Sequence, residues 1–431
     1  MRATVGGDAK EVGRLTKIAQ LRGMDPNQRD RNDWTPLLKA AFHGHLGLVK
    51  HLLRQSQDRS SSVASMGSLR SQSTGSGARP SFQQPSRMTS VARSEGAGGA
   101  SESVTPLWLA AYKGHLHVVE YLAEEYPAQL LTACEGVTPF LTAVHEGHTD
   151  LVEYLVRQPE VDINETNSDG LSAIAIAAKK GWGRLVQMLL RFSVDVNDSR
   201  SGFTPLMYAA HGGCHTVCKI LIEEGDADTK ATTDDGKTAL LLSLRKGHSS
   251  CFFLLLAAGV VLDSGMQELV IFEAVRRGHM RIVRGLISDG HVAANINVAD
   301  GTTLVHIAAE SGHTDLVRCL VNEFQLPIAK DTFGVAPIHV AARMGHLATV
   351  RWLLEHGSVP VDITSSAGNT ALYEAARNGH ADLVRYLVRT AKANTKLAST
   401  KGKVPIDVAR LGGHKSCVDI LRKAEPKWQV L

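Results

Sequence analysis

The chain has 431 residues, with 47 basic and 43 acidic side chains and a formal net charge of +4. Charges this balanced give no direct indication of a nucleic-acid partner. The longest apolar run, from Cys251 to Leu262, has 12 residues, fewer than the roughly 20 that a membrane-spanning helix needs, and no signal peptide is visible after Met1. We therefore expect no membrane span and a cytoplasmic or nuclear location.

A unit of two short helices is encoded by residues 105–122. Thr105 is suited to cap the first helix, Pro106 fits its first turn, and Gly114 ends it. A second, amphipathic helix follows from His115, with its apolar side chains at helical spacing. Such a unit is too small to bury its own apolar faces, so it must stack on others.

The unit recurs along almost the whole chain. Nine intervals between successive Gly-His glycines, from Gly114 to Gly413, span 299 residues, a mean of about 33 residues, which is the ankyrin period. A Thr-Pro-Leu start lies nine residues before the glycine in units such as 35–37 and 204–206, and Asp-Gly turns separate the units. The chain resembles the ankyrin-repeat family. The resemblance implies an all-α solenoid of about eleven full helix–turn–helix repeats and a partial N-terminal one, with short β-hairpin-like turns.

The repeats predict four parts of the chain: a partial repeat and the first full repeat in 1–54, an insertion in 55–103, about ten repeats in 104–424, and a tail in 425–431. Gly7-Asp8 stands where Gly-His stands elsewhere, so the preceding helix would need residues before Met1. Two interpretations stay open. Residues 1–6 form a stunted capping helix, or the chain starts further upstream.

The insertion at 55–103 is rich in Ser and Gly and has a single aromatic residue, Phe82. It lacks the apolar content that a folded core needs, so we expect a disordered loop. Its arginines make Ser71, Ser73 and Ser94 candidate phosphorylation sites, which would reverse the local charge. The alternative is a solvated spacer without a regulatory role.

One repeat departs from the pattern. The interval from Gly247 to Gly278 is 31 residues, and Leu269-Val270-Ile271 replaces the Thr-Pro-Leu start. In the repeat before it, Phe253 occupies an outward position that is polar in the other ten units. Either a shifted neighbouring repeat covers Phe253, or the ring is an exposed contact for a partner. We favour coverage, because the short interval lies at the same place.

Several residue clusters resemble chemical sites, but their positions in the repeat explain them. Zinc would need His211, Cys214, His215 and Cys218 to converge, and the repeat register places them on different faces. Cys218, Cys251 and Cys417 occupy apolar positions of second helices, so they are expected to be buried thiols in a reducing compartment. Asn197 resembles ankyrin asparagines that are hydroxylated, although an ordinary turn position also accounts for it.

Basic side chains recur just before the Gly-His step. The resemblance implies that a partner lies against the hairpin tips and first helices, on the concave side, where these positions project. We call the following nine residues the basic strip: Lys179, Lys180, His211, Arg245, Lys246, Arg276, Arg277, Arg343 and Arg377. A strip of one charge focuses potential, which predicts an acidic or phosphorylated segment in the partner. The alternative is a solvated face.

The resemblance implies a non-catalytic scaffold or adaptor that binds a partner protein as a monomer. The sequence predicts no catalytic residue, no metal site and no cofactor. Two other classes stay open: a substrate-recognition subunit of a ubiquitin ligase or a delivered effector, and an enzyme with an unfamiliar site. An adaptor-binding segment would indicate the former, and a deep pocket with convergent titratable groups the latter.

Limited proteolysis tests the insertion. Because 55–103 is expected to be exposed and unfolded, a protease should cut there first and leave the repeats after Val104 folded. Fragment masses and the helical circular-dichroism signal are the measurements. An uncut insertion, or a helical signal that collapses after the cut, would contradict this expectation.

Overall fold

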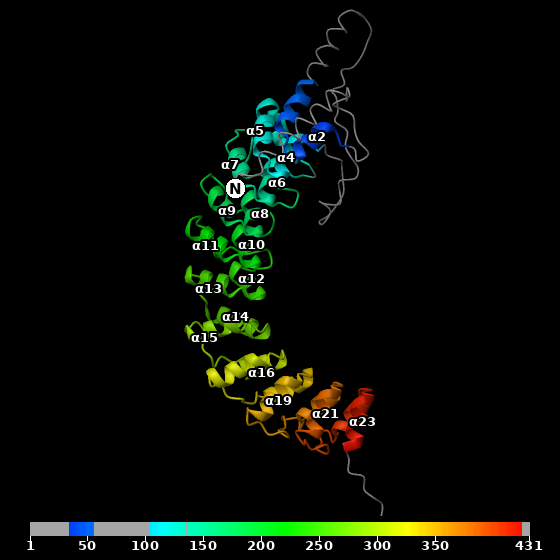
Figure 1. Cartoon of the computed structure of the whole chain (residues 1–431). Coiled ribbons are helices and arrows are strands. Elements are labelled where there is room, and N and C mark those ends of the chain that lie inside the picture. Colours follow the sequence, from blue (N-terminus) through cyan, green and yellow to red (C-terminus); the bar gives the residue numbers. More distant parts are fainter. Residues whose placement is uncertain (1–33, 56–103, 135, 425–431) are drawn as a thin grey trace, which may run out of the picture. The chain divides into compact units, whose positions relative to one another are not determined.

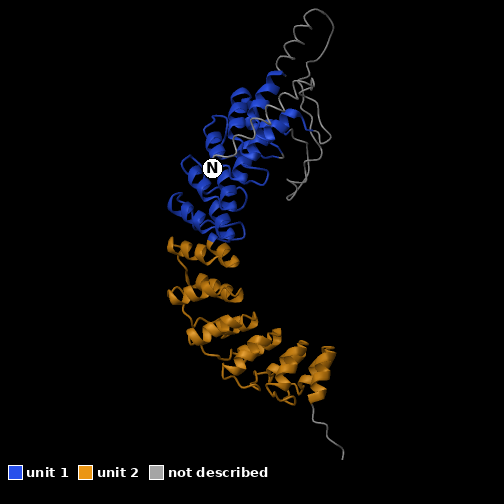
Figure 2. Ribbon diagram, in the orientation of Figure 1, with its two compact units in different colours: residues 1–239 blue, residues 240–431 orange. Residues whose placement is uncertain are grey.

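The computed structural model describes residues 34–55, 104–134 and 136–424. The chain falls into two compact units, residues 1–239 and 240–431 (Figure 2). The described residues form eleven helix pairs without a β-sheet, which confirms the predicted all-α solenoid. The predicted partial repeat before Trp34 lies outside the described residues. So do the tail and, except for Gln55, the insertion with Ser71, Ser73 and Ser94.

Each pair consists of a first, inner helix and a second, outer helix (Figure 1). In the first unit these are α2 (Pro36–Phe42) with a helix over 46–55, α4 (Pro106–Lys113) with α5 (Leu116–Glu125), α6 (Pro139–Glu146) with α7 (Thr149–Val156), α8 (Ala173–Lys180) with α9 (Gly183–Leu189), and α10 (Pro205–Gly212) with α11 (His215–Glu223). A 3₁₀ turn, Pro127–Leu131, follows α5.

The second unit begins within α12 (Ala239–Lys246), which pairs with α13 (Ser249–Ala257). The later pairs are α14 (Ser264–Arg276) with α15 (Met280–Ser288), α16 (Leu304–Glu310) with α17 (Thr314–Arg318), α18 (Pro337–Met344) with α19 (Leu347–Glu355), α20 (Ala371–Arg377) with α21 (Ala381–Arg389), and α22 (Pro405–Leu411) with α23 (Lys415–Ala424). A π-helical turn, Cys319–Glu323, continues α17.

A hairpin tip, called a finger here, precedes most inner helices. Isolated antiparallel bridges close four fingers: Cys134 with Val137, Thr166 with Ser172, Thr232 with Thr238, and Asn297 with Thr303. The inner helices then start as predicted. The Thr105 hydroxyl accepts from the Trp108 N–H at 3.1 Å, and Pro106 occupies the first turn. Thr138 and Thr204 cap α6 and α10 in the same way.

A histidine joins neighbouring repeats within each unit. The imidazole of His115 lies on Gly44, where a Cβ would come within 2.7 Å of the ring, and its Nε2–H donates to the Phe42 carbonyl at 2.9 Å. We call this contact the histidine clip. It recurs at 2.8 to 3.1 Å from His148 to Tyr112, His313 to Arg276, His346 to Glu310, His380 to Arg343 and His414 to Arg377.

The stack continues across the insertion. Helix α2 packs against α4, and the Lys113 ammonium lies 4.7 Å from the centroid of the Phe42 ring. On the outer side, the Lys50 ammonium lies 4.8 Å from the centroid of the Tyr121 ring. Cation–π contacts of this kind contribute about 0.5–1 kcal/mol each at partly exposed sites, so the two repeats that flank the insertion are neighbours in space.

Phe253 is half-buried and lies against the next repeat. Its ring faces Gly285 on α15, where a Cβ would come within 2.2 Å of Cζ. It also meets the buried Phe252 ring edge-on at 5.4 Å. The neighbouring repeat therefore covers the ring as we favoured, but only in part. Because Gly285 has no side chain, the Phe253 ring has space to lie against α15.

Two inner-helix histidines are buried and satisfied in their neutral form. His339 Nε2–H donates to the Ile363 carbonyl at 2.9 Å, and its Nδ1 accepts from the Ala336 N–H at 2.9 Å. His306 binds the Val335 carbonyl and the Thr303 N–H in the same way. Burial lowers the pKa of both imidazoles from the ordinary value of 6.5. Protonation would place a second hydrogen against an N–H donor.

The pair of Phe253 and Gly285 predicts a sign reversal. In the Phe253→Ala background, Gly285→Ala should stabilise the chain by about 0.5–1 kcal/mol, the usual gain for alanine over glycine in a helix. With Phe253 present the same change should destabilise it, because the new methyl group displaces the ring. Denaturant melts of the four proteins in this double-mutant cycle measure the coupling. A coupling near zero would show that the ring does not rest on Gly285.

The buried histidines predict a loss of stability in acid. Because the folded pKa of His339 lies below 6.5, its contribution is fully present above that pH and is lost as the pH falls through the folded pKa. The fall in melting temperature between about pH 7.5 and about pH 5.5 should therefore be smaller in His339→Gln. The exposed His291→Gln change is the matched control. If the melting temperature falls equally in both variants, groups other than His339 cause the acid sensitivity.

Candidate functional site

The basic strip lies at the C-terminal ends of inner helices. In the first unit, Lys179 and Lys180 are the last two residues of α8, and His211 is the next-to-last residue of α10. All three are exposed. In the second unit Arg245, Lys246, Arg276, Arg277, Arg343 and Arg377 occupy equivalent positions and are also exposed. Within each unit the strip residues thus lie at or directly after the ends of first helices, and their binding of a partner stays a prediction.

In the first unit, aromatic rings lie beside the strip residues Lys179 and His211. The Lys179 ammonium lies 5.7 Å from the centroid of the Tyr208 ring. Phe203, from the finger before α10, contacts Tyr208 at 5.3 Å and His211 at 6.3 Å between ring centroids. These rings give a partner flat apolar surface beside a cation. The sequence pattern of charges did not indicate this cluster.

In the second unit two strip arginines share one carboxylate. Glu273 on α14 pairs with Arg277 at 2.6 Å and with Arg276 at 3.7 Å. Arg277 also donates from Nη1 to the Arg245 carbonyl of the preceding repeat at 3.3 Å. Arg277 is therefore held in place beside Arg245, and one negative charge offsets part of the local positive charge.

The strip is interrupted further along. Glu310 occupies the position between Arg276 and Arg343 in the repeat series. Arg343 lies 3.6 Å from the buried carboxylate of Glu374, which accepts a second bond from the Asn369 amide at 2.8 Å. Arg343 is thus partly a structural partner of Glu374. The second unit carries a basic pair of repeats, an acidic repeat, and then two more arginines.

Local structure explains some of these charges. A cation in the last turn of a helix offsets the partial negative charge there and contributes about 0.3–1 kcal/mol when exposed. This accounts for a basic preference at the ends of α8, α12 and α14 without any partner. Within the part of the chain that the structure describes, Lys180, Arg245 and Lys246 have no carboxylate partner. Their charges face solvent.

The other predicted candidates have structural roles. Cys218 is fully buried, while Cys214 lies against Gly181 and His215 is exposed. Among the described residues no three His, Cys, Asp or Glu side chains are placed to hold a metal ion. Asn197 Oδ1 accepts from the Asp228 N–H of the next finger at 2.8 Å, which is a turn role, and its hydroxylation stays untested.

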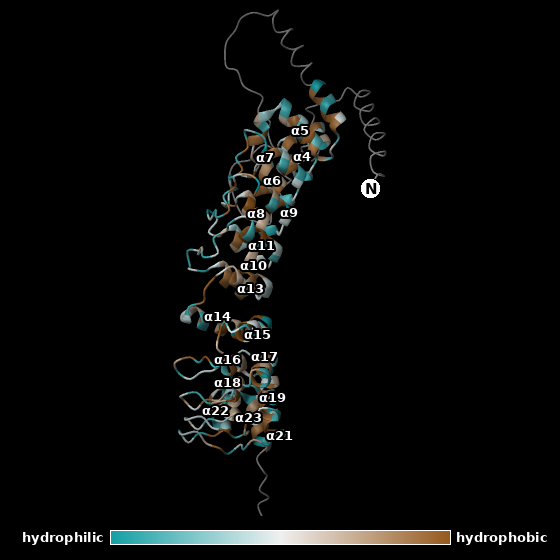
Figure 3. Cartoon of the chain, turned by 90° about the vertical axis from the view of Figure 1, so that its left-hand side faces the viewer, coloured by the Kyte–Doolittle hydropathy of each residue, from teal (hydrophilic) through white to brown (hydrophobic). Residues whose placement is uncertain are grey.

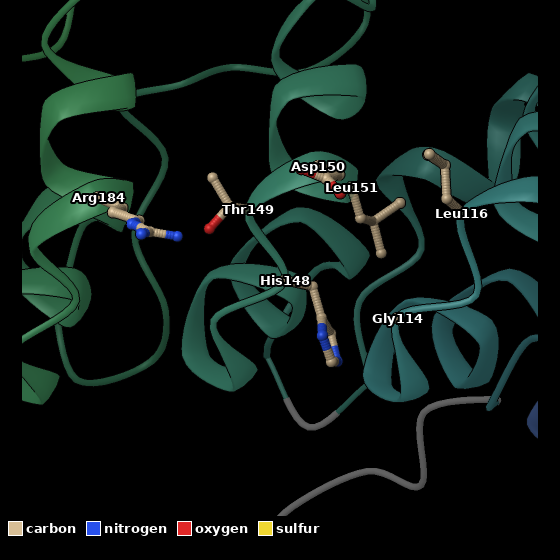
Figure 4. A pocket seen from close by; sticks show the side chains of 7 residues that line it. All are labelled: Gly114, Leu116, His148, Thr149, Asp150, Leu151 and Arg184. Atoms are coloured by element: carbon tan, nitrogen blue, oxygen red, sulfur yellow. The ribbon is translucent and has the colours of Figure 1, made fainter. Parts of the chain in front are cut away.

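A shallow open depression of about 420 Å³ lies on the side of the outer helices. It is formed where α5, α7 and α9 begin, as Figure 4 shows, and the sequence did not indicate it. The lining residues are Gly114, Leu116, His148, Thr149, Asp150, Leu151 and Arg184. Its histidine already donates to the Tyr112 carbonyl in a clip, so this ring has a structural role.

Comparisons with known proteins agree with the repeat geometry. A family profile described as ankyrin repeats in three copies matches residues 91–167, 142–233, 174–264 and 271–365. Profiles for many ankyrin copies and for a single ankyrin repeat match residues 353–409 and 32–61. In the described residues, no helix has both the length and the apolar character to cross a membrane.

The chain is also similar to parts of longer proteins. It is 30% identical over 156 residues to ankyrin repeat and SAM domain-containing protein 6 of Danio rerio, covering 35% of this chain and 21% of that protein. It is 37% identical over 89 residues to dauer abnormal formation protein 25 of Caenorhabditis elegans, covering 20% and 23%. It is 32% identical over 149 residues to palmitoyltransferase AKR1 of Lachancea kluyveri, covering 34% and 20%.

The matched part thus spans less than a quarter of each of these relatives. Their individual activities lie within proteins that are mostly unmatched, so the similarity concerns the repeats. The profiles cover well over half of the chain, and the described residues form eleven helix pairs, many of which share the threonine cap and the histidine clip. The chain belongs to the ankyrin-repeat family, and its repeats support a role in protein–protein interaction.

Proposed function

We propose that the chain is a non-catalytic scaffold or adaptor that binds an acidic or phosphorylated segment of a partner protein along the concave groove of its repeats. The observation that supports this most is the exposed cationic group formed by Arg245, Lys246 and Arg277. Arg277 is already held by Glu273 and the Arg245 carbonyl. Binding an anion there would cost little side-chain entropy, because one guanidinium is positioned in advance.

The aromatic cluster in the first unit supports a protein partner in particular. Tyr208 and Phe203 offer ring surface next to Lys179. Aromatic side chains are among the types that contribute most to protein interfaces. A small anion would need only the charges, whereas a peptide chain can use both the rings and the charges.

The six cysteines support a reducing compartment. All six are free thiols, and five of them are buried. We therefore propose a cytoplasmic or nuclear location, where such thiols stay reduced. We also propose that the scaffold acts as a monomer, which sedimentation of the purified chain at several concentrations tests directly.

The partner can be identified by pull-down with the full chain as bait, followed by mass spectrometry. Charge reversal then tests the strip. Changing Arg245, Lys246 and Arg276 of the second unit together to Glu should weaken binding by about tenfold or more, because three attractive contacts become repulsive. Raising the salt concentration should also weaken partner binding by the unchanged protein, because salt screens the attraction between the charges.

The matched control reverses Lys219, Arg318 and Arg385, which are exposed on outer helices and sit in solvent-exposed ion pairs. This control has the same change in net charge and should bind normally, since such pairs contribute little to stability. Both triple variants should melt close to the unchanged protein. Equal binding by the two triple variants would make the strip a solvated face.

A further inference from the structure

The fingers of the second unit form a hydrogen-bonded column. The Thr332 N–H donates to the Asp300 carbonyl, the Ser366 N–H to the Phe333 carbonyl, and the Thr400 N–H to the Ala367 carbonyl, each at 3.0 Å. In every case the acceptor is the residue before the finger glycine, and the donor is two residues before the glycine of the next finger. One main-chain bond thus recurs at three successive joints.

The column lacks a finger before residue 297. The chain leaves α13 through Gly259, and Asp263 caps a helix at once by accepting from the Met266 N–H at 2.8 Å. As a result α14 has 13 residues, whereas α16 has 7 and α18 has 8. The residues that would form a finger are used as the first turns of α14, which also explains the short interval of 31 residues.

The finger at 297–303 therefore has an open edge. By register, its donor for a preceding finger is the N–H of Ala299, two residues before Gly301. Ala299 is exposed, and within the described residues its N–H has no hydrogen-bond acceptor. The finger itself is well formed, because the Gly301 N–H donates to the Val298 carbonyl at 2.8 Å and closes a turn. The free donor is thus held on an ordered turn.

Exposed apolar side chains occur before and after this break in the sequence. Val261, in the connection from α13 to α14, is 84% exposed, and Leu269 on α14 is 49% exposed. Val298, beside Ala299, is 38% exposed. The connection itself carries the hydrophobic colour in Figure 3. These are three of the six large apolar side chains that the described part of the second unit exposes.

We propose that this edge is a docking site for a turn or extended segment of a partner protein. The partner supplies one main-chain carbonyl to the Ala299 N–H and an apolar side chain beside Val298. The three joints that follow show the chemistry that fits, since a peptide carbonyl from a finger occupies the same position in each. The site is separate from the basic strip, and it stands whether or not the strip binds anything.

A cyclic peptide that carries residues 330–336 is a suitable probe, because its Phe333 carbonyl already makes this bond within the chain. It is added to the full chain labelled with ¹⁵N-alanine, in which the Ala299 amide signal is assigned by its loss in Ala299→Gly. The expected result is a concentration-dependent shift of that amide and slower exchange of its hydrogen with solvent. The matched control peptide has the Phe333 carbonyl reduced to a methylene, and it should leave the amide unchanged.

The Ala299→Pro variant removes the donor and little else. Position 299 is the second residue of the turn from Val298 to Gly301, where proline is favoured. Binding of the probe should weaken about fivefold or more, which corresponds to the net free energy of one hydrogen bond. The melting temperature should stay unchanged. Thr332→Pro is the contrast, because the N–H at that position is used, and it should lower the melting temperature.

Three results would overturn the proposal. The probe leaves the Ala299 amide unshifted, the reduced peptide shifts it equally, or Ala299→Pro binds the probe as well as the unchanged chain does. A fourth is self-association: the amide shifts with chain concentration alone, and sedimentation shows a larger species that Ala299→Pro abolishes. That outcome would assign the edge to a second copy of this chain.

Discussion

The stack depends on the contact between a glycine and the histidine of the next repeat. The glycine ends an inner helix in the left-handed region, as Gly345 does at φ +80°, and its missing Cβ makes room for the imidazole of His380. The imidazole then satisfies a carbonyl of the last helical turn, the Arg343 carbonyl at 2.8 Å, which the helix itself leaves unpaired. One contact therefore completes a helix end and joins two repeats.

The same contact fixes the candidate binding surface. Three of the carbonyls that accept from clip histidines belong to residues of the basic strip, namely Arg276, Arg343 and Arg377. Their backbones are held by the next repeat while their side chains remain exposed. At these three positions the clip uses the backbone alone, so the arginine side chains can change without removing the clip acceptor. In the first unit, Trp182 and Cys214 stand in place of clip histidines.

The sequence predicted those features that a fixed period and local chemistry determine. Helix pairs, threonine caps, left-handed glycines and buried alanines all follow from residues at known distances along the chain. It did not predict the ion pair between Arg343 and Glu374, because these residues belong to different repeats and meet only in the folded chain. The pairs of Glu273 with Arg276 and Arg277 have helical i,i+3 and i,i+4 spacing, which the sequence analysis did not use. The early start of α14 was also missed, since Asp263 acts as a cap only once the finger is absent.

The repeat that contains α14 brings the two proposed surfaces together within the second unit. Its N-terminal turns replace the missing finger, and its C-terminal end carries Arg276 and Arg277. A helix of 13 residues is about 20 Å long at 1.5 Å per residue. The place of the absent finger and two strip arginines thus lie at opposite ends of the same helix. This repeat lacks a finger, and α14 nevertheless packs against α15 and α16. Within the second unit, the finger at 297–303 is thus left without the preceding finger that the three later fingers have.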